Sequence, residues 1–149
     1  MLFDVKKYEL PHDDEVDWLQ TKTNLGIFLG RYKTVREKMK LPVSPKLSER
    51  YFLGHDERVT ENNHLFEESY QEFEQIHGIF ISGMLAIVHP FKPEVSDRRR
   101  KVFILRYMYG FSIPLVSDRI HYQKNIIVDD SKMAILQFTA ATELLCLKN

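Results

Sequence analysis

Apolar residues recur at three- and four-residue steps along most of the chain, and this spacing predicts helices rather than strands. The first predicted helix covers residues 24–40, and Pro42 follows and ends it. Its apolar positions share one face: Leu25, Phe28, Leu29, Tyr32, Val35 and Met39. Ser44 and Pro45 then supply an N-cap and a first-turn proline, which predicts a short helix over residues 45–53.

A longer helical pattern begins at Asn62 or Asn63, after a predicted loop over residues 54–63, and extends to His89. Its apolar positions again form one stripe: Phe66, Tyr70, Phe73, Ile76, Phe80, Met84 and Val88. A helix of that length would be a rod of about 42 Å. We interpret the stripe as core or as a dimer interface, and the two prolines that follow predict a linker.

Two further helices with a tight connection are predicted after this linker. The first is expected to begin at a cap at Ser96 or Asp97 and to end at Gly110, which we expect in a left-handed conformation. Ser112 then caps a short helix that ends near His121. Both helices are amphipathic, so each should pack on its neighbours through one face.

A last helix is predicted from about Gln123 to Leu147, and with the two before it this helix fits a helix-turn-helix. In that motif a short helix packs on a scaffold and the next helix enters the DNA major groove. Val116 and Ile120 lie four residues apart on the short helix and are expected to face the core. Ile126 and Ile127 are expected to anchor the last helix in the same way.

The exposed start of the last helix is therefore the predicted reading head. It consists of Gln123, Lys124 and Asn125. Gln and Asn side chains pair bidentately with adenine, whereas Lys reaches guanine or phosphate.

Charge is distributed unevenly along the chain. The 21 Lys and Arg residues balance 21 Asp and Glu residues, so any DNA affinity must come from clustering. Residues 98–127 hold one acid against seven bases: Arg98, Arg99, Arg100, Lys101, Arg106, Arg119 and Lys124. We expect Arg98 to Lys101 and Arg119 to bind the phosphate backbone and fix the register. Asp129 and Asp130 are expected to face away from the DNA or to pair with Lys132 or Arg119.

The segment 98–138 resembles region four of sigma factors, their C-terminal DNA-binding region. The matching residues are Arg100, Leu105, Arg106, Tyr107, Gly110 and Ser112. Most of the chain resembles the late transcription regulators of temperate phages of Gram-positive bacteria, the ArpU and LtrC type, through these residues: Leu29, Arg31, Tyr32, Ser131, Lys132, Ala134 and Phe138. The resemblance implies an activator of packaging, structural and lysis genes, and some such proteins are targets of inhibitors made by phage satellites.

Other classes of function find little support in the sequence. The chain has no Gly-rich phosphate loop or nucleophile elbow and its six His lack paired ligand spacing, so we expect no catalytic residue, no metal site and no cofactor. Cys146 is the single cysteine, which we interpret as a buried structural thiol in a reducing cytoplasm. The longest apolar run, residues 78–88, is too short to span a bilayer, and no signal peptide is evident, so no membrane partner is expected.

These patterns predict an all-α protein with two regions. Residues 1–93 would form a helical region with a long central helix, and residues 94–149 a sigma-like helix-turn-helix. The expected function is sequence-specific regulation of transcription on double-stranded DNA, with a homodimer, host RNA polymerase or a satellite-encoded inhibitor as further partners. Two alternatives remain open: an adaptor that has the fold but does not bind DNA, and a regulator that contacts RNA polymerase through its acidic N-terminal arm or helix. The arm, residues 1–20, is expected to pack on the body.

Overall fold

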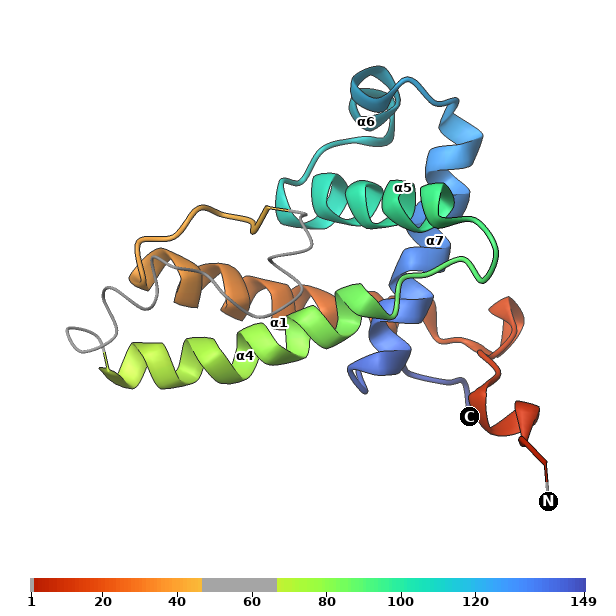
Figure 1. Ribbon diagram of the computed structural model, residues 1–149, viewed down its shortest axis with the longest axis horizontal. Helices are drawn as coiled ribbons and strands as arrows, with labels where there is room; N and C mark the ends of the chain where they lie inside the picture. The colour runs from red at the N-terminus through yellow and green to blue at the C-terminus, as the bar shows by residue number, and fades with distance from the viewer. Residues whose placement is uncertain (1, 47–66) are drawn as a thin grey trace.

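The computed structural model describes residues 2–46 and 67–149, and every regular element within these ranges is helical (Figure 1). Helices α1 (Trp18–Lys38) and α4 (Glu67–Leu85) lie side by side and run in opposite directions. Helix α7 (Lys124–Ala141) packs against this pair and against α5 (Pro93–Phe103), and the short α6 (Ile113–Ile120) lies beyond α5. The predicted all-α fold is confirmed.

Helix α1 begins at Trp18, earlier than the predicted start at residue 24. Asp17 caps it by accepting a hydrogen bond from the Gln20 amide at 3.0 Å, which satisfies one of the free N–H groups of the first turn. The C-terminal tail also holds this start, because the Asp17 amide donates to the Cys146 carbonyl at 2.9 Å. The spacing of apolar residues does not reveal this turn, since it is fixed by a polar cap and by a contact from the other end of the chain.

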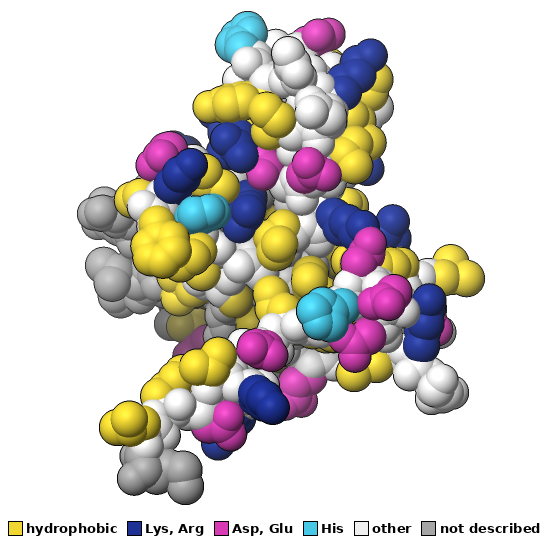
Figure 2. Space-filling view, turned by 90° about the vertical axis from the view of Figure 1, so that its right-hand side faces the viewer, with side chains coloured by type: hydrophobic (Ala, Val, Ile, Leu, Met, Phe, Trp, Pro, Cys, Tyr) yellow, Lys and Arg dark blue, Asp and Glu magenta, His cyan; other side chains and the backbone are white. Residues whose placement is uncertain are grey.

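Only the second half of the N-terminal arm predicted over residues 1–20 packs on the body as expected: Val16 is completely buried, and the Lys148 amide donates to the Glu15 carbonyl at 2.9 Å. Two 3-10 turns, Val5–Tyr8 and Asp13–Glu15, precede α1. The apolar side chains before the second turn face solvent, with Leu2 94% and Phe3 71% exposed. Figure 2 shows these first residues projecting from the lower part of the molecule, with hydrophobic side chains exposed.

Helix α4 ends at Leu85, so the predicted end at His89 is wrong. The chain leaves the helix because neighbouring helices satisfy its next polar groups. The Val88 carbonyl accepts hydrogen bonds from α5 and α7, and the His89 amide donates to Ser96 Oγ at 2.6 Å. The predicted start of this helix, the loop over 54–63 and most of the short helix over 45–53 lie outside the described residues; Pro45 and Lys46, which are described, are not helical.

Helix α5 begins at Pro93, so neither Ser96 nor Asp97 is its cap. Pro93 occupies the first turn, where backbone N–H groups have no helical acceptor, so the N–H that proline lacks costs no hydrogen bond. The helix continues as a π-helical segment, Ile104–Met108, and Gly110 follows with φ +73°, the left-handed conformation expected of it. Ser112 caps α6 as predicted, because its side chain accepts from the Leu115 amide at 3.3 Å.

Helix α7 begins where predicted but ends at Ala141 rather than near Leu147. The residues after it return to the start of α1, where Leu147 forms an isolated bridge with Val16. The Cys146 amide has no helical acceptor and donates instead to Thr21 Oγ1 at 3.0 Å. Cys146 is only partly buried, which corrects the expectation of a buried thiol.

Two groups of buried residues hold the elements together. The larger group draws on α1, α4, α5, the π-helical segment and α7, so it joins residues from both predicted regions, 1–93 and 94–149. Its aromatic centre includes Phe103 and Phe138, whose rings stack with centroids 4.7 Å apart. A smaller separate cluster consists of Val102, Val116 and Ile127, with partly buried neighbours from α6 and the segment before it. None of the helices in the described ranges is long and apolar enough to cross a bilayer.

Gly110→Val is expected to lower the free energy of unfolding by about 1–2 kcal/mol, because L side chains disfavour the left-handed region. A Cβ at Gly110 would meet no atom within 4 Å, so the effect is conformational rather than steric. Chemical denaturation of both proteins measures it. Gly30→Ala, in α1 and equally open, is the control and should not destabilise the protein. Unchanged stability in Gly110→Val would contradict the strain argument.

Candidate nucleic-acid interface

Helices α6 and α7, the two helices of the predicted helix-turn-helix, share a small core with α5. Val116 of α6 and Ile127 of α7 are completely buried and pack with Val102 of α5. Figure 1 shows α6 and the start of α7 at the end of the molecule away from the α1–α4 pair. The small core is thus a cluster separate from the main aromatic one.

The turn between α6 and α7 has three residues, His121 to Gln123. His121 adopts the left-handed conformation, with φ 61°, at the position where glycine is favoured after a helix. Its amide donates to the Ser117 carbonyl at 2.9 Å, and Ser117 Oγ donates to the Tyr122 carbonyl. Side-chain and backbone hydrogen bonds from α6 thus hold the turn in place.

The three predicted reading residues lie together at the start of α7. The structure leaves them all exposed: Gln123, Lys124 and Asn125. Ile127 points into the small core and Ile126 is partly buried, as the spacing predicted. Gln123 occupies the N-cap position but its side chain makes no capping hydrogen bond, so that side chain is available to a ligand.

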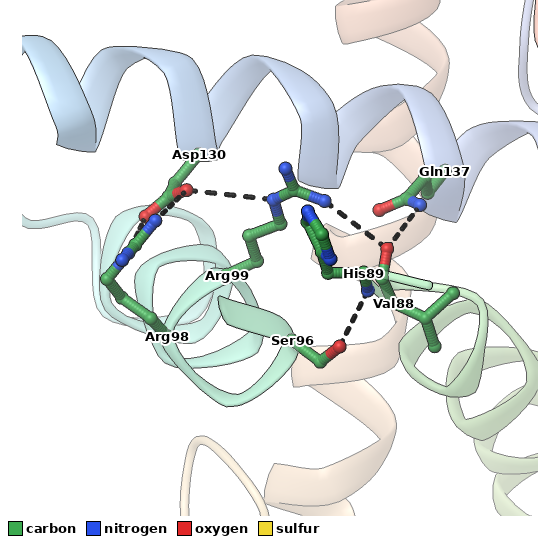
Figure 3. A network of polar contacts seen from close by, with 7 residues as sticks. All are labelled: Val88, His89, Ser96, Arg98, Arg99, Asp130 and Gln137. Atoms are coloured by element: carbon green, nitrogen blue, oxygen red, sulfur yellow. Dashed lines mark hydrogen bonds and ion pairs between the residues drawn. The ribbon is translucent and has the colours of Figure 1, made fainter. Parts of the chain in front are cut away.

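Arg98 and Arg99, predicted to bind phosphate, bind the protein itself (Figure 3). Arg98 donates two hydrogen bonds to Asp130, at 2.6 and 3.1 Å, and its guanidinium lies 4.9 Å from the centre of the Tyr122 ring. Hydrogen bonding to Asp130 raises the pKa of Arg98 above its usual value. Arg99 approaches the same carboxylate at 3.7 Å and donates to the Val88 carbonyl at 3.2 Å.

The acid in this network is buried. Asp130 is 3% exposed and lies between the two arginines, whereas Asp129 is exposed. Asp130, expected to face away from the DNA or to pair with Lys132 or Arg119, pairs with Arg98 and Arg99, whereas Lys132 pairs with Asp13 of the N-terminal segment. Figure 3 shows the carboxylate between Arg98 and Arg99, with Gln137 of α7 donating to the Val88 carbonyl from the other side. The network joins α5, α7 and the end of α4.

The remaining predicted phosphate ligands differ in their surroundings. Arg100 donates to the Met84 carbonyl at 3.1 Å and is partly buried. Lys101 and Arg119 are exposed, and the Arg119 guanidinium lies 4.6 Å from the centre of the Phe111 ring. No ion pair involves Lys101, Arg119 or Lys124 in the part of the chain that the structure describes. These three cations are the ones available to phosphate.

Protein-family models, curated proteins and solved structures offer no match to this chain. Its geometry and sequence are therefore the basis for assigning a function.

Two contacts that support the helix-turn-helix had no signal in the sequence. Lys33 of α1 donates to the Tyr107 carbonyl at 2.7 Å, and burial lowers the pKa of Lys33. Arg106 donates to the Phe111 carbonyl at 3.0 Å. A π-helical turn leaves carbonyls out of the regular hydrogen-bond pattern, and these cations satisfy carbonyls in and just after it. Helical periodicity does not reveal such a turn, so it was not predicted.

His77 and His89 have structural contacts through their side chains. His77 is buried and shares a 2.7 Å hydrogen bond with the Tyr32 hydroxyl, and His89 Nδ1 accepts from the Phe91 and Lys92 amides. No group of three His, Cys, Asp or Glu within residues 2–46 and 67–149 is placed to hold a metal ion. His55 and His64 lie outside these ranges.

Proposed function

We propose that the protein is a sequence-specific regulator that reads duplex DNA with the start of α7. The observation that carries this proposal is the pairing of α6 and α7 over their own small core, with Gln123, Lys124 and Asn125 exposed at the start of the second helix. In helix-turn-helix proteins this end of the second helix meets base edges in the major groove. Amide side chains there would select adenine, and Lys124 would select guanine or bind phosphate.

The basic residues divide into two groups in this proposal. Lys101, Arg119 and Lys124 are exposed and would neutralise phosphates, which gives sequence-independent affinity. Arg98 and Arg99 act as positioning residues, because they hold α7 on α5 through Asp130. Their contribution to DNA binding is thus expected to follow from the orientation of α7 rather than from direct contact.

Asn125→Ala is expected to weaken binding to the preferred duplex by about 2 kcal/mol and to relax selectivity at one base pair. The preferred duplex is obtained by selection from a random library, and fluorescence anisotropy measures the affinity. Binding to an unrelated duplex should barely change, since phosphate contacts supply it. Asn149→Ala, at the exposed C-terminus, is the matched control. An Asn125→Ala protein that folds normally and keeps full selectivity would place the reading head elsewhere.

Lys101→Gln and Arg119→Gln are each expected to lower the slope of log affinity against log salt concentration by about one unit. Affinity for all duplexes should fall alike, because phosphate contacts carry no sequence information. Lys148→Gln, an exposed change far from α6, should leave the slope as it is. Equal slopes in all of these proteins would exclude Lys101 and Arg119 from the interface.

The biological role that we propose with this activity rests on the sequence resemblance: activation of late genes of a temperate phage, in the cytoplasm of a bacterial host. Host RNA polymerase, a second copy of the chain and a satellite-encoded inhibitor are the protein partners that belong to this role. Chromatin immunoprecipitation during phage induction tests it, with enrichment expected upstream of the packaging, structural and lysis genes. Enrichment elsewhere would contradict the role without contradicting DNA binding.

One observation favours a second candidate, a protein-interaction adaptor. The N-terminal arm exposes Leu2, Phe3, Val5 and Tyr8, and exposed apolar clusters often mark protein interfaces. Salt-dependent binding to duplex DNA separates the two functions. A folded protein with no affinity for any duplex at low salt would favour the adaptor.

A further inference from the structure

A cavity of about 330 Å³ lies where the start of α1, the π-helical segment, the start of α6 and α7 meet. Its apolar walls come from all four elements: Trp18, Tyr107, Ile113, Val128 and Ile135. Pockets that bind small molecules have volumes of roughly 300–1,000 Å³, mainly apolar walls and a few converging polar groups. The size and the walls of this cavity match that description.

The polar groups in the cavity are predominantly cationic. Lys22, Arg106 and Lys132 line it, and the described residues that line it include neither Asp nor Glu. Asp13 pairs with Lys132 from outside and accepts from Trp18 Nε1 at 2.7 Å. Of the three lining cations, Lys132 alone has an ion pair among the described residues, and Lys22 and Arg106 have none.

Two buried polar atoms of the lining, Arg106 Nε and Ser131 Oγ, make no hydrogen bond of good geometry within the described residues, although both side chains lie beside the Tyr107 hydroxyl. Ser131 is 6% exposed, so water from the surface does not readily replace a missing partner. An unsatisfied buried donor is unfavourable by about 1–3 kcal/mol, more for a charged group. Burial raises the pKa of Tyr107, and the Arg106 charge and the contacts of its hydroxyl with Ser131 and Arg106 oppose that rise, so its phenol is enclosed as well.

We propose that this cavity binds an amphipathic organic anion, a small molecule with a planar apolar body and one anionic head. The body would lie among Trp18, Tyr107 and Ile135, and the head would accept hydrogen bonds from Arg106 Nε and Ser131 Oγ. Lys22 would add charge attraction at the opening, where its side chain is exposed. An anion is the ligand that both satisfies the unpaired donors and offsets the excess of positive charge. The ligand site does not depend on DNA binding.

Fluorescence titration tests this site directly, because Trp18 is the only tryptophan of the chain. The probes are 1-anilinonaphthalene-8-sulfonate, an aromatic anion, and N-phenyl-1-naphthylamine, which lacks the sulfonate. Saturable quenching of Trp18 is expected with the anionic probe, with weaker binding of the neutral one. Equal affinity for both probes, or no saturable quenching, would overturn the proposal.

Two variants assign the binding to this cavity. Lys22→Glu, an exposed change, is expected to lower the affinity for the anionic probe about tenfold through charge repulsion and to leave the affinity for the neutral probe unchanged. Ser131→Leu, which fills the cavity, should lower the affinity for both probes. Circular dichroism checks that this variant folds. Lys38→Glu, at the other end of α1, is the matched charge control and should change neither affinity. An anionic probe bound as tightly by Lys22→Glu as by the unaltered protein would refute the site.

Discussion

Asp130→Ala is expected to lower the free energy of unfolding by about 4 kcal/mol, because removing one partner of a buried ion pair leaves charge without compensation. Asp130 is 3% exposed and accepts two hydrogen bonds from Arg98, and Arg99 also lies within ion-pair distance. The substitution therefore leaves two largely buried guanidinium groups without their counter-ion. Urea denaturation followed by circular dichroism measures the change.

Asp129→Ala is the matched control for this variant, since it removes the same group one residue earlier. Asp129 is exposed, and surface substitutions of this kind change stability by about 0.5 kcal/mol or less. Similar losses in the two variants would mean that the network in Figure 3 does not stabilise the fold.

Gly83→Ala is expected to destabilise the protein by about 3 kcal/mol through overpacking. A Cβ at Gly83 would lie 2.5 Å from Cδ2 and 2.7 Å from Cζ of Phe138, closer than carbon atoms approach without displacement. Phe138 cannot easily move, because its ring is completely buried and stacks on Phe103. Thermal unfolding should show a lower midpoint.

Gly78→Ala in the same helix should have the opposite effect. A Cβ at Gly78 would meet nothing within 4 Å, so only helix propensity changes, and alanine is favoured over glycine by about 0.8–1.0 kcal/mol. The pair of variants separates packing from propensity at two positions of α4. If Gly83→Ala were as stable as Gly78→Ala, α4 and α7 would be farther apart than described here.

These two stability predictions affect how DNA-binding tests are interpreted, because α7 is part of both the main core and the candidate DNA-binding surface. Its first turn carries the proposed reading residues, and its later residues, including Phe138, form part of the main core. Substitution of Arg98 or Arg99 would disturb the anchoring of α7 through Asp130. A loss of DNA affinity in such variants would therefore not identify a phosphate contact, whereas Lys101 and Arg119 permit that conclusion.

Much of the candidate interface could be predicted from local sequence signals. Helical spacing placed Ile126 and Ile127 inward and left Gln123, Lys124 and Asn125 exposed, because a helix turns by a fixed angle per residue. Gly110 and Ser112 were placed correctly for a similar reason, since backbone conformation and capping involve residues close in the chain. That these residues bind DNA remains a prediction, as does the role in phage gene expression.

The sequence by itself determined the all-α fold, the turns around α6 and the exposed start of α7, all of which depend on interactions over a few residues. Tertiary structure alone decided what the basic cluster contacts. The sequence marks Arg98 and Arg99 as cations, but Asp130, about thirty residues away, forms ion pairs with both inside the protein. It also decided where α1 begins and α4 ends, because distant groups satisfy the backbone there: the Cys146 carbonyl at Asp17, and the side chains of Arg99 and Gln137 at Val88. The spacing of apolar residues shows which face of a helix is buried, but not which distant polar group will contact that helix.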